Sequence, residues 1–234
     1  MTSPEDPFMK AARYTWLYPE PYDWAEAFDY ACQCKDCWRP VLKAKDQWLG
    51  GILDDEDQHP GSSAILIFYR WFLLKNLFES KIVNYYDYFI VTRSDYYYIK
   101  PHPKLPLSMD PNHIWIPEGE DYGGITDRHI VVSRKHVHAA LSLMDPIIQD
   151  PKGLLREMQG HDEWNLEQFI KYQFETRGIL QHVRRFPRIM YAVRTSNTST
   201  RWRSGTFVKE AGMIVKYMTE YNAAKKSTPL VELY

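Results

Sequence analysis

A long apolar segment, followed closely by a second one, constrains the fold of this chain more than any other feature. Residues 62–81 place apolar side chains on nearly every face of a predicted helix, with Ser62 or Ser63 as its cap. A helix of this kind is buried, so other elements must enclose it. After a turn, Tyr88–Thr92 is an unbroken β-branched and aromatic run, which predicts a central strand covered on both faces.

Shorter segments of both kinds alternate along the rest of the chain. The predicted strands are residues 113–117, 128–133 and 189–195. The predicted helices are residues 23–32, 133–144, 165–177 and 207–224. This alternation predicts an α/β fold with a mixed sheet. The glycine-rich fingerprints GxGxxG and GxxxxGK[ST] are absent from the sequence, which argues against dehydrogenases and P-loop enzymes.

Charge is balanced overall and uneven along the chain. The 234 residues carry a net charge of -1, so no global field draws the protein to a nucleic acid or a membrane, and no nucleic-acid partner is expected. Residues 1–60 hold twelve acidic and six basic side chains, whereas residues 184–226 hold ten basic and two acidic ones. The basic segment is suited to contact phosphate groups.

Nothing in the sequence indicates secretion or a membrane span. The N-terminus lacks a basic start followed by an apolar run, and the most apolar stretch, Ala64–Phe78, is short and contains Arg70 and Lys75. We therefore expect a soluble, cytoplasmic protein without a transmembrane segment, or a soluble domain of a larger or anchored one. The oligomeric state is left open.

All three cysteines lie in one short segment, at Cys32, Cys34 and Cys37. Three interpretations stay open: reduced thiols near a helix end, a reversible Cys34–Cys37 bridge, or a zinc site completed by His59. A single triplet without a second CxxC favours the first two.

Thr92-Arg93-Ser94-Asp95 follows the apolar strand directly. Ligands of open α/β sheets bind beyond the carboxyl ends of strands, so Arg93 and Asp95 are placed to contact a phosphate and a divalent cation. Carboxylate oxygens suit Mg²⁺ or Mn²⁺, which commonly bridge carboxylates and substrate phosphates. The alternative is a surface ion pair at a strand end.

A second candidate segment is the acidic, glycine-containing loop of residues 118–129. Gly123 and Gly124 would let the backbone approach a ligand closely, and Asp127 is the candidate for the catalytic base or for contact with the substrate. The alternative is a solvated acidic loop.

Two further segments carry candidate groups. Asp162 and Glu163 precede a predicted helix and would supply the base if Asp127 does not. In the basic segment, Arg194, Arg201 and Arg203 have guanidinium groups that match diphosphate oxygens. The alternative for these arginines is a basic, solvated face.

Three features together resemble glycosyltransferases of the GT-A fold. They are the long buried helix, the Tyr-Asp-Tyr-Phe-Ile strand followed by Arg93-Ser94-Asp95, and the loop with Gly123, Gly124 and Asp127. The similarity is to enzymes of viral and bacterial surface-polysaccharide synthesis, in which Arg-x-Asp stands in for Asp-x-Asp. The resemblance implies that Asp95 binds Mn²⁺ or Mg²⁺ on the donor diphosphate and that Arg93 contacts the nucleotide. It also implies that the glycine loop lines the donor-sugar and acceptor pocket.

The resemblance covers residues 62–205 and implies a mixed, mostly parallel central sheet flanked by helices. Residues 62–234 would form the catalytic core with a basic C-terminal segment, preceded by a divergent or incomplete segment of residues 1–61. The implied partners are a nucleotide-sugar donor and a glycan or glycoprotein acceptor. The alternatives are another phosphate-handling enzyme, such as a nucleotidyltransferase or hydrolase, and a non-catalytic carbohydrate- or protein-binding module.

Overall fold

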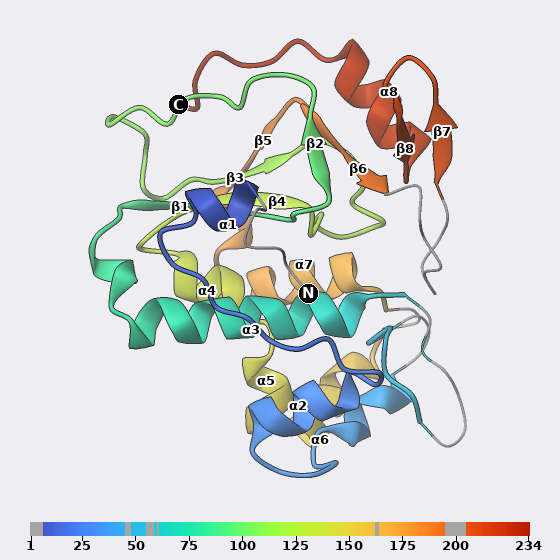
Figure 1. Cartoon of the computed structure of the whole chain (residues 1–234). Helices are drawn as coiled ribbons and strands as arrows, with labels where there is room; N and C mark the ends of the chain where they lie inside the picture. The colour runs from blue at the N-terminus through green and yellow to red at the C-terminus, as the bar shows by residue number, and fades with distance from the viewer. Residues whose placement is uncertain (1–6, 45–47, 55–58, 60, 162–163, 195–204) are drawn as a thin grey trace.

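Two sheets lie above a layer of helices in this computed structural model, which describes residues 7–44, 48–54, 59, 61–161, 164–194 and 205–234 (Figure 1). The helix α3 (Ser63–Glu79) runs along the boundary between the sheets and the lower helices. The prediction of a mixed α/β fold is confirmed. Within the described ranges, no helix is both long and apolar enough to cross a membrane.

The remaining helices are mostly short. They are α1 (Pro7–Ala11), α2 (Ala25–Cys32), α4 (Val137–Leu141), α5 (Asp145–Gln149), α6 (Pro151–Met158), α7 (Leu166–Thr176) and α8 (Met218–Lys226), with 3₁₀ turns at Arg39–Lys43, Ile82–Asn84 and Leu180–His182. Asn165 caps α7 by accepting from the Gln168 backbone N–H at 2.9 Å, which confirms the predicted cap.

The main hydrophobic core joins the N-terminal part of the chain to α3 and α7. Trp24, Phe28 and Trp38 are buried in the same cluster as Phe68 of α3 and Phe169 of α7. Large aromatic rings contribute much of the apolar area that is removed from water on folding. The described part of residues 1–61 therefore shares its core with the rest of the chain.

The first sheet has the strand order β1-β4-β3-β5. Its strands are β1 (Tyr88–Thr92), β3 (Ile114–Pro117), β4 (His129–Ser133) and β5 (Val183–Phe186). Every residue of β3 and β4 is buried, whereas β1 lies at the edge and Ile90 at its centre is 48% exposed. The prediction that Tyr88–Thr92 is a central, buried strand is therefore wrong. Phe89 and Val91 pack against the main core and Tyr88 packs against a second one, while Ile90 and Thr92 are exposed.

The second sheet has the strand order β2-β6-β8-β7 and carries α8. Its strands are β2 (Tyr96–Tyr98), β6 (Met190–Arg194), β7 (Thr206–Val208) and β8 (Met213–Val215). The predicted helix over residues 207–224 is wrong at its start, where β7, a turn and β8 form a hairpin. Gly212 in that turn has a φ of +65°, a backbone conformation that favours glycine and ends a helix.

The prediction of a mostly parallel sheet is wrong as well. In the described part of the chain, β3 and β5 are parallel, while the other strand pairs of both sheets are antiparallel. Antiparallel strands need no helical crossover between them. Most of the helices, among them α3 and α7, lie below the first sheet, while α8 packs on the second sheet (Figure 1).

The cysteine segment follows α2. Cys34 and Cys37 form a disulfide, and Cys32 is free, so the structure shows the second of the three interpretations. Burial raises the pKa of the Cys32 thiol to about 11, which makes it unreactive at neutral pH.

Candidate functional site

The Arg93–Asp95 segment is a turn through which the chain passes from the first sheet to the second. It joins the end of β1 to the start of β2, and the Val193 N–H donates to the Asp95 carbonyl at 2.8 Å, which holds the turn against β6. On its other side, Thr92 lies opposite His129 in the β1–β4 register. This register brings Asp127 and Arg128, which precede β4, next to the same turn.

Arg93 and Asp95 form a bidentate ion pair at this turn. The Arg93 Nε and Nη2 donate to the two Asp95 carboxylate oxygens at 2.9 and 2.7 Å. Arg93 Nη1 also lies 3.4 Å from an Asp127 carboxylate oxygen. Burial alone would raise the pKa of Asp95, but the Arg93 hydrogen bonds and charge, with Lys216 and Arg194 nearby, lower it. The Asp95 carboxylate is therefore ionised, and the Arg93 guanidinium binds both of its oxygens.

Two more cations approach Asp95 from the second sheet. Arg194 is the last residue of β6, and its Nη1 lies 3.6 Å from an Asp95 oxygen. Lys216 comes directly after β8, the strand that pairs with β6. Burial and the charges of Arg93 and Arg194 lower the pKa of Lys216 to about 8. We call Arg93, Asp95, Arg194 and Lys216 the rim cluster; it holds three cations and one carboxylate.

Behind the rim cluster lies a second, more deeply buried group of charges. Arg128 pairs with the carboxylate of Asp127, with Glu220 at 3.2 Å and with Glu167 at 3.8 Å. The inner cluster consists of Asp127, Glu167 and Glu220 with Arg70, Arg128 and Arg188. It thus holds equal numbers of acidic and basic side chains, as the burial of charge requires.

Glu220 ties three elements into the inner cluster. Its carboxylate accepts from the Ala192 backbone N–H of β6 at 2.8 Å and from the Tyr96 hydroxyl of β2 at 3.4 Å, besides the contact with Arg128. Arg188 lies 3.8 Å from the same carboxylate and donates to the carbonyls of Glu118 and Gly119 at 2.9 and 2.8 Å. The acidic loop is held to the second sheet in this way.

Asp127 has a fully buried side chain and is the member of the inner cluster that contacts the rim cluster, through Arg93. Burial would raise its pKa, but the charges of Arg128, Arg93 and Arg70 lower it, so Asp127 is ionised. Arg70, the one charged residue on the buried face of α3, also donates to the Asp127 carbonyl at 3.1 Å. A carboxylate held so firmly in its ionised form is a weak proton acceptor, and its contacts suit it to position Arg93.

Glu167, in the first turn of α7, has a raised pKa, in contrast to the lowered pKa of Asp127. Burial and the nearby charge of Asp127 raise the pKa of Glu167 to about 7, although Arg128 opposes the shift. Its carboxyl group therefore changes its protonation state near neutral pH.

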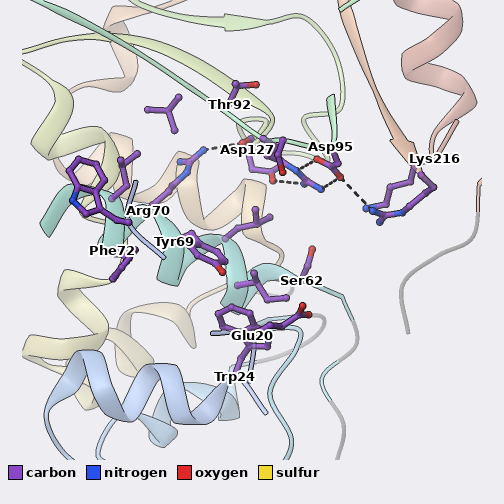
Figure 2. Close-up of a pocket in the computed structure, with 18 residues that line it drawn as sticks. Glu20, Trp24, Ser62, Tyr69, Arg70, Phe72, Thr92, Asp95, Asp127 and Lys216 are labelled. Carbon is purple, nitrogen blue, oxygen red and sulfur yellow. Dashed lines mark hydrogen bonds and ion pairs between the residues drawn. The ribbon is translucent and has the colours of Figure 1, made fainter. Parts of the chain in front are cut away.

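An open cavity of about 630 Å³ lies between α3, the N-terminal segment and the turn after β1 (Figure 2). The N-terminal segment contributes Trp16, Glu20 and Trp24 to the cavity lining. Ser62, just before α3, and Tyr69 within α3 line it as well, and the rim cluster forms the opposite wall. The view shows Asp95 and Lys216 on one side of the cavity and Tyr69 and Trp24 on the other. One part of the cavity is therefore aromatic and the other is cationic.

The two glycines of the acidic loop face α7 and not the cavity. A β-carbon on Gly124 would lie 2.0 Å from the Glu167 carbonyl oxygen, and one on Gly123 would lie 3.3 Å from the Gln168 side chain. Both glycines permit close packing of the loop on the first turn of α7. The ligand contact predicted for them is not what their positions support.

The structure thus brings together four of the predicted residues: Arg93, Asp95, Asp127 and Arg194. The other predicted residues Asp162, Glu163, Arg201 and Arg203 lie outside the described ranges. Sequence reasoning missed Lys216, Glu220 and the role of Arg70. Only Arg70 carried a signal, since it is a charged residue within an otherwise apolar helix.

The donor atoms around Asp95 do not fit a divalent cation. Mg²⁺ and Mn²⁺ take oxygen ligands with free lone pairs, whereas both Asp95 oxygens accept from Arg93 and one also faces Arg194. Asp127, the second carboxylate that Arg93 contacts, has its side chain enclosed by arginines. Among the described residues there is no group of three or more His, Cys, Asp or Glu placed to hold a metal ion. The role of Asp95 as a metal ligand stays a prediction.

Comparison with known proteins yields one family. The family model described as "Domain of unknown function (DUF7796)" matches residues 72–207, which include β1 to β6 and three residues of the rim cluster. No curated protein and no solved structure matches the chain.

Proposed function

The chain belongs to the family described as Domain of unknown function (DUF7796), and we propose that it is a glycosyltransferase whose cavity binds the donor nucleotide sugar. The observation that carries the proposal is the rim cluster, in which three cations surround one carboxylate at the wall of a cavity. Such an excess of positive charge suits an anionic ligand.

The rest of the cavity favours a ligand that also has flat or apolar faces. Trp16 and Tyr69 line it opposite the rim cluster, and Tyr69 is 40% exposed, whereas Trp24 behind them is almost wholly buried. Aromatic rings pack well against nucleobases and against the apolar faces of sugars. A nucleotide sugar carries both features in one molecule, and a volume of about 630 Å³ is within the range of small-molecule sites.

Within this proposal the predicted roles are redistributed. Arg93 and Arg194 contact the diphosphate, and Asp127 positions Arg93 instead of accepting a proton, because its pKa is lowered and its oxygens are paired. The base that activates the acceptor hydroxyl is then Asp162 or Glu163, as predicted from the sequence.

Calorimetric titration of the full chain with a panel of nucleotide sugars and their free nucleotides tests the proposal. We expect one nucleotide series to bind, and we expect Tyr69→Ala to weaken that binding at least tenfold without unfolding the protein. Tyr85→Ala is the matched control, because Tyr85 is exposed and lies away from the cavity lining. If no nucleotide binds, or if both variants behave alike, the proposal is wrong.

Product analysis separates this proposal from the alternatives. A transferase consumes the nucleotide sugar at an appreciable rate only when a glycan acceptor is present. A hydrolase releases sugar or phosphate without an acceptor, and a binding module leaves the nucleotide sugar intact. Nuclear magnetic resonance of the donor with and without a mixture of glycan acceptors distinguishes the three.

A further inference from the structure

Asp95 is the residue whose surroundings depart most from the expected metal site. Its two oxygens are engaged by the planar fork of Arg93, at 2.9 and 2.7 Å, and Arg194 approaches one of them to 3.6 Å. A divalent cation bound there would have to displace Arg93 and would then lie beside three positive charges. The turn is thus constructed to hold cationic side chains and not to receive a further cation.

The cations of the rim cluster have unused binding capacity. Lys216 has no carboxylate within 4.0 Å in the described part of the chain, and the buried Arg194 Nε has no hydrogen-bond acceptor there. Burial and the neighbouring charges of Arg93 and Arg194 lower the pKa of Lys216 to about 8, and the charge of Asp95 only partly opposes this shift. Asp95 offsets one of the three positive charges, so the rim cluster itself keeps an excess of two. Over the whole cavity lining, which adds Arg70, Glu20 and Asp127, the charge stays positive by one.

We propose that Arg93, Arg194 and Lys216 take the place of the divalent metal and neutralise the diphosphate of the donor directly. This inference rests on the proposed function. Two positive charges match the two negative charges that a diphosphate diester carries at neutral pH. Donors from three separate side chains also hold both phosphoryl groups in one orientation.

The same three residues stabilise the leaving group during transfer. As the bond between the anomeric carbon and the diphosphate oxygen breaks, its electron pair stays on that oxygen and adds a third negative charge. The acceptor hydroxyl oxygen forms the new bond to the anomeric carbon, and its proton passes to the base. Preorganised cations that contact the developing charge lower the barrier in the way that a metal ion does in other transferases.

Titration with uridine and guanosine diphosphate, in EDTA and in MnCl₂ or MgCl₂, tests the inference. We expect the dissociation constant in EDTA to lie within threefold of the value with either metal. Binding that is more than tenfold tighter with Mn²⁺ or Mg²⁺, or that occurs only with a metal, overturns the inference and leaves the proposed function standing. Absence of binding under every condition overturns both.

Variants of Lys216 give an independent test. We expect Lys216→Met to weaken binding of the diphosphate in EDTA at least tenfold, and Lys216→Arg to retain it within threefold because the positive charge remains. Lys225→Met is the matched control, since Lys225 lies outside the cavity lining and pairs with Glu210 at 2.7 Å. Equal affinity of Lys216→Met and the unaltered protein would contradict the inference.

The pH profile adds a readout that a structural role would not alter. The charged groups that face Lys216 are Arg93, Arg194 and Arg128, which stay charged, and Asp95, which stays ionised. A nucleoside diphosphate is fully ionised above a pH of about 7, because its last phosphate pKa is near 6. Affinity should therefore fall as pH rises through about 8 in the unaltered protein and stay constant in Lys216→Arg. A fall of equal size in both overturns the inference.

Discussion

The rim cluster and the inner cluster lie side by side and share Arg93–Asp127 as their point of contact, yet they differ in charge balance. The inner cluster holds three arginines and three carboxylates and is almost wholly buried. Arg128 and Arg188 lie within 4.0 Å of carboxylates, and Arg70 donates to the Asp127 carbonyl. The rim cluster holds three cations and the single carboxylate of Asp95, with Asp127 of the inner cluster 3.4 Å from Arg93, and it faces a cavity. Buried charge must be compensated within the protein, whereas charge at a cavity wall is free to be compensated by a ligand.

This difference assigns the two clusters to stability and to binding. Substitutions in the inner cluster should destabilise the fold, because each leaves a partner buried without compensation. Substitutions of rim cations should leave the fold intact and affect ligand affinity. The following experiments measure how sharply the two effects divide.

Glu220→Ala should have the largest effect. It removes the acceptor of the Ala192 N–H and leaves Arg128 with less compensation in a buried site. Loss of one partner of a buried ion pair costs about 3–5 kcal/mol of the free energy of unfolding. Urea denaturation followed by circular dichroism measures it, with Glu210→Ala on the exposed Lys225 pair as a control that should change little. A small loss in Glu220→Ala would remove the distinction between the clusters.

Asp95→Asn tests the one carboxylate of the rim cluster. The amide oxygen can accept from only one of the two Arg93 nitrogens that now donate to Asp95, the negative charge is lost, and three cations are left close together. We expect the free energy of unfolding to fall by about 1.5–3 kcal/mol, the usual contribution of hydrogen bonds to charged groups. Added phosphate should restore part of this stability in thermal melts, as an anion then takes the place of the carboxylate. Sulfate and phosphate without any effect would argue against an anion site.

Glu167→Gln tests the pH dependence of the inner cluster. The pKa of Glu167 rises from 4.5 to about 7 on folding, so between those values the folded state binds more protons than the unfolded state. The free energy of unfolding contributed by Glu167 therefore falls as pH rises through this window, whereas Gln does not ionise. The variant should gain about 2–3 kcal/mol relative to the unaltered protein between pH 5 and pH 8. Urea denaturation of both proteins at the two pH values measures this difference; a constant difference would contradict it.

Lys216→Met should have the smallest effect on stability. It removes one of three mutually repelling cations and breaks no ion pair within 4.0 Å to a described carboxylate. We expect the free energy of unfolding to stay within about 0.5 kcal/mol, as for substitutions away from buried features. A loss above about 2 kcal/mol would show that the rim cluster is as structural as the inner one.

Local sequence signals predicted the elements and their ends better than the sheet order. The apolar segment of α3, the Asn165 cap and the apolar run of β4 each depend on residues close in sequence. An apolar run also predicted a central position for β1, but the run alone does not reveal whether a partner strand lies on each side. The hairpin of β7 and β8 was mistaken for a helix, although Gly212 marked its turn.

In the candidate site, too, the residues predicted from the sequence are those marked by local signals. Arg93, Asp95 and Asp127 lie directly at strand ends, where sequence reasoning looks for ligand groups, and the structure brings them together with Arg194. Glu220 and Lys216 were missed because their contacts depend on pairing between distant segments. Arg128 and Glu220, for example, are 92 residues apart. Charge pattern along the sequence does not show which distant residues will compensate one another.

The position of Glu220 on α8 also defines the smallest unit that can fold. The family match ends at residue 207, but the carboxylate that compensates Arg128 and Arg188 follows that point in the chain. A fragment truncated at residue 207 would keep the buried arginines and lose their partner, together with β8 and Lys216. Any truncated form used for crystallisation or expression should therefore keep α8 and also Leu233, which is fully buried and donates to the Lys104 carbonyl. The boundary of sequence similarity is not the boundary of the folding unit.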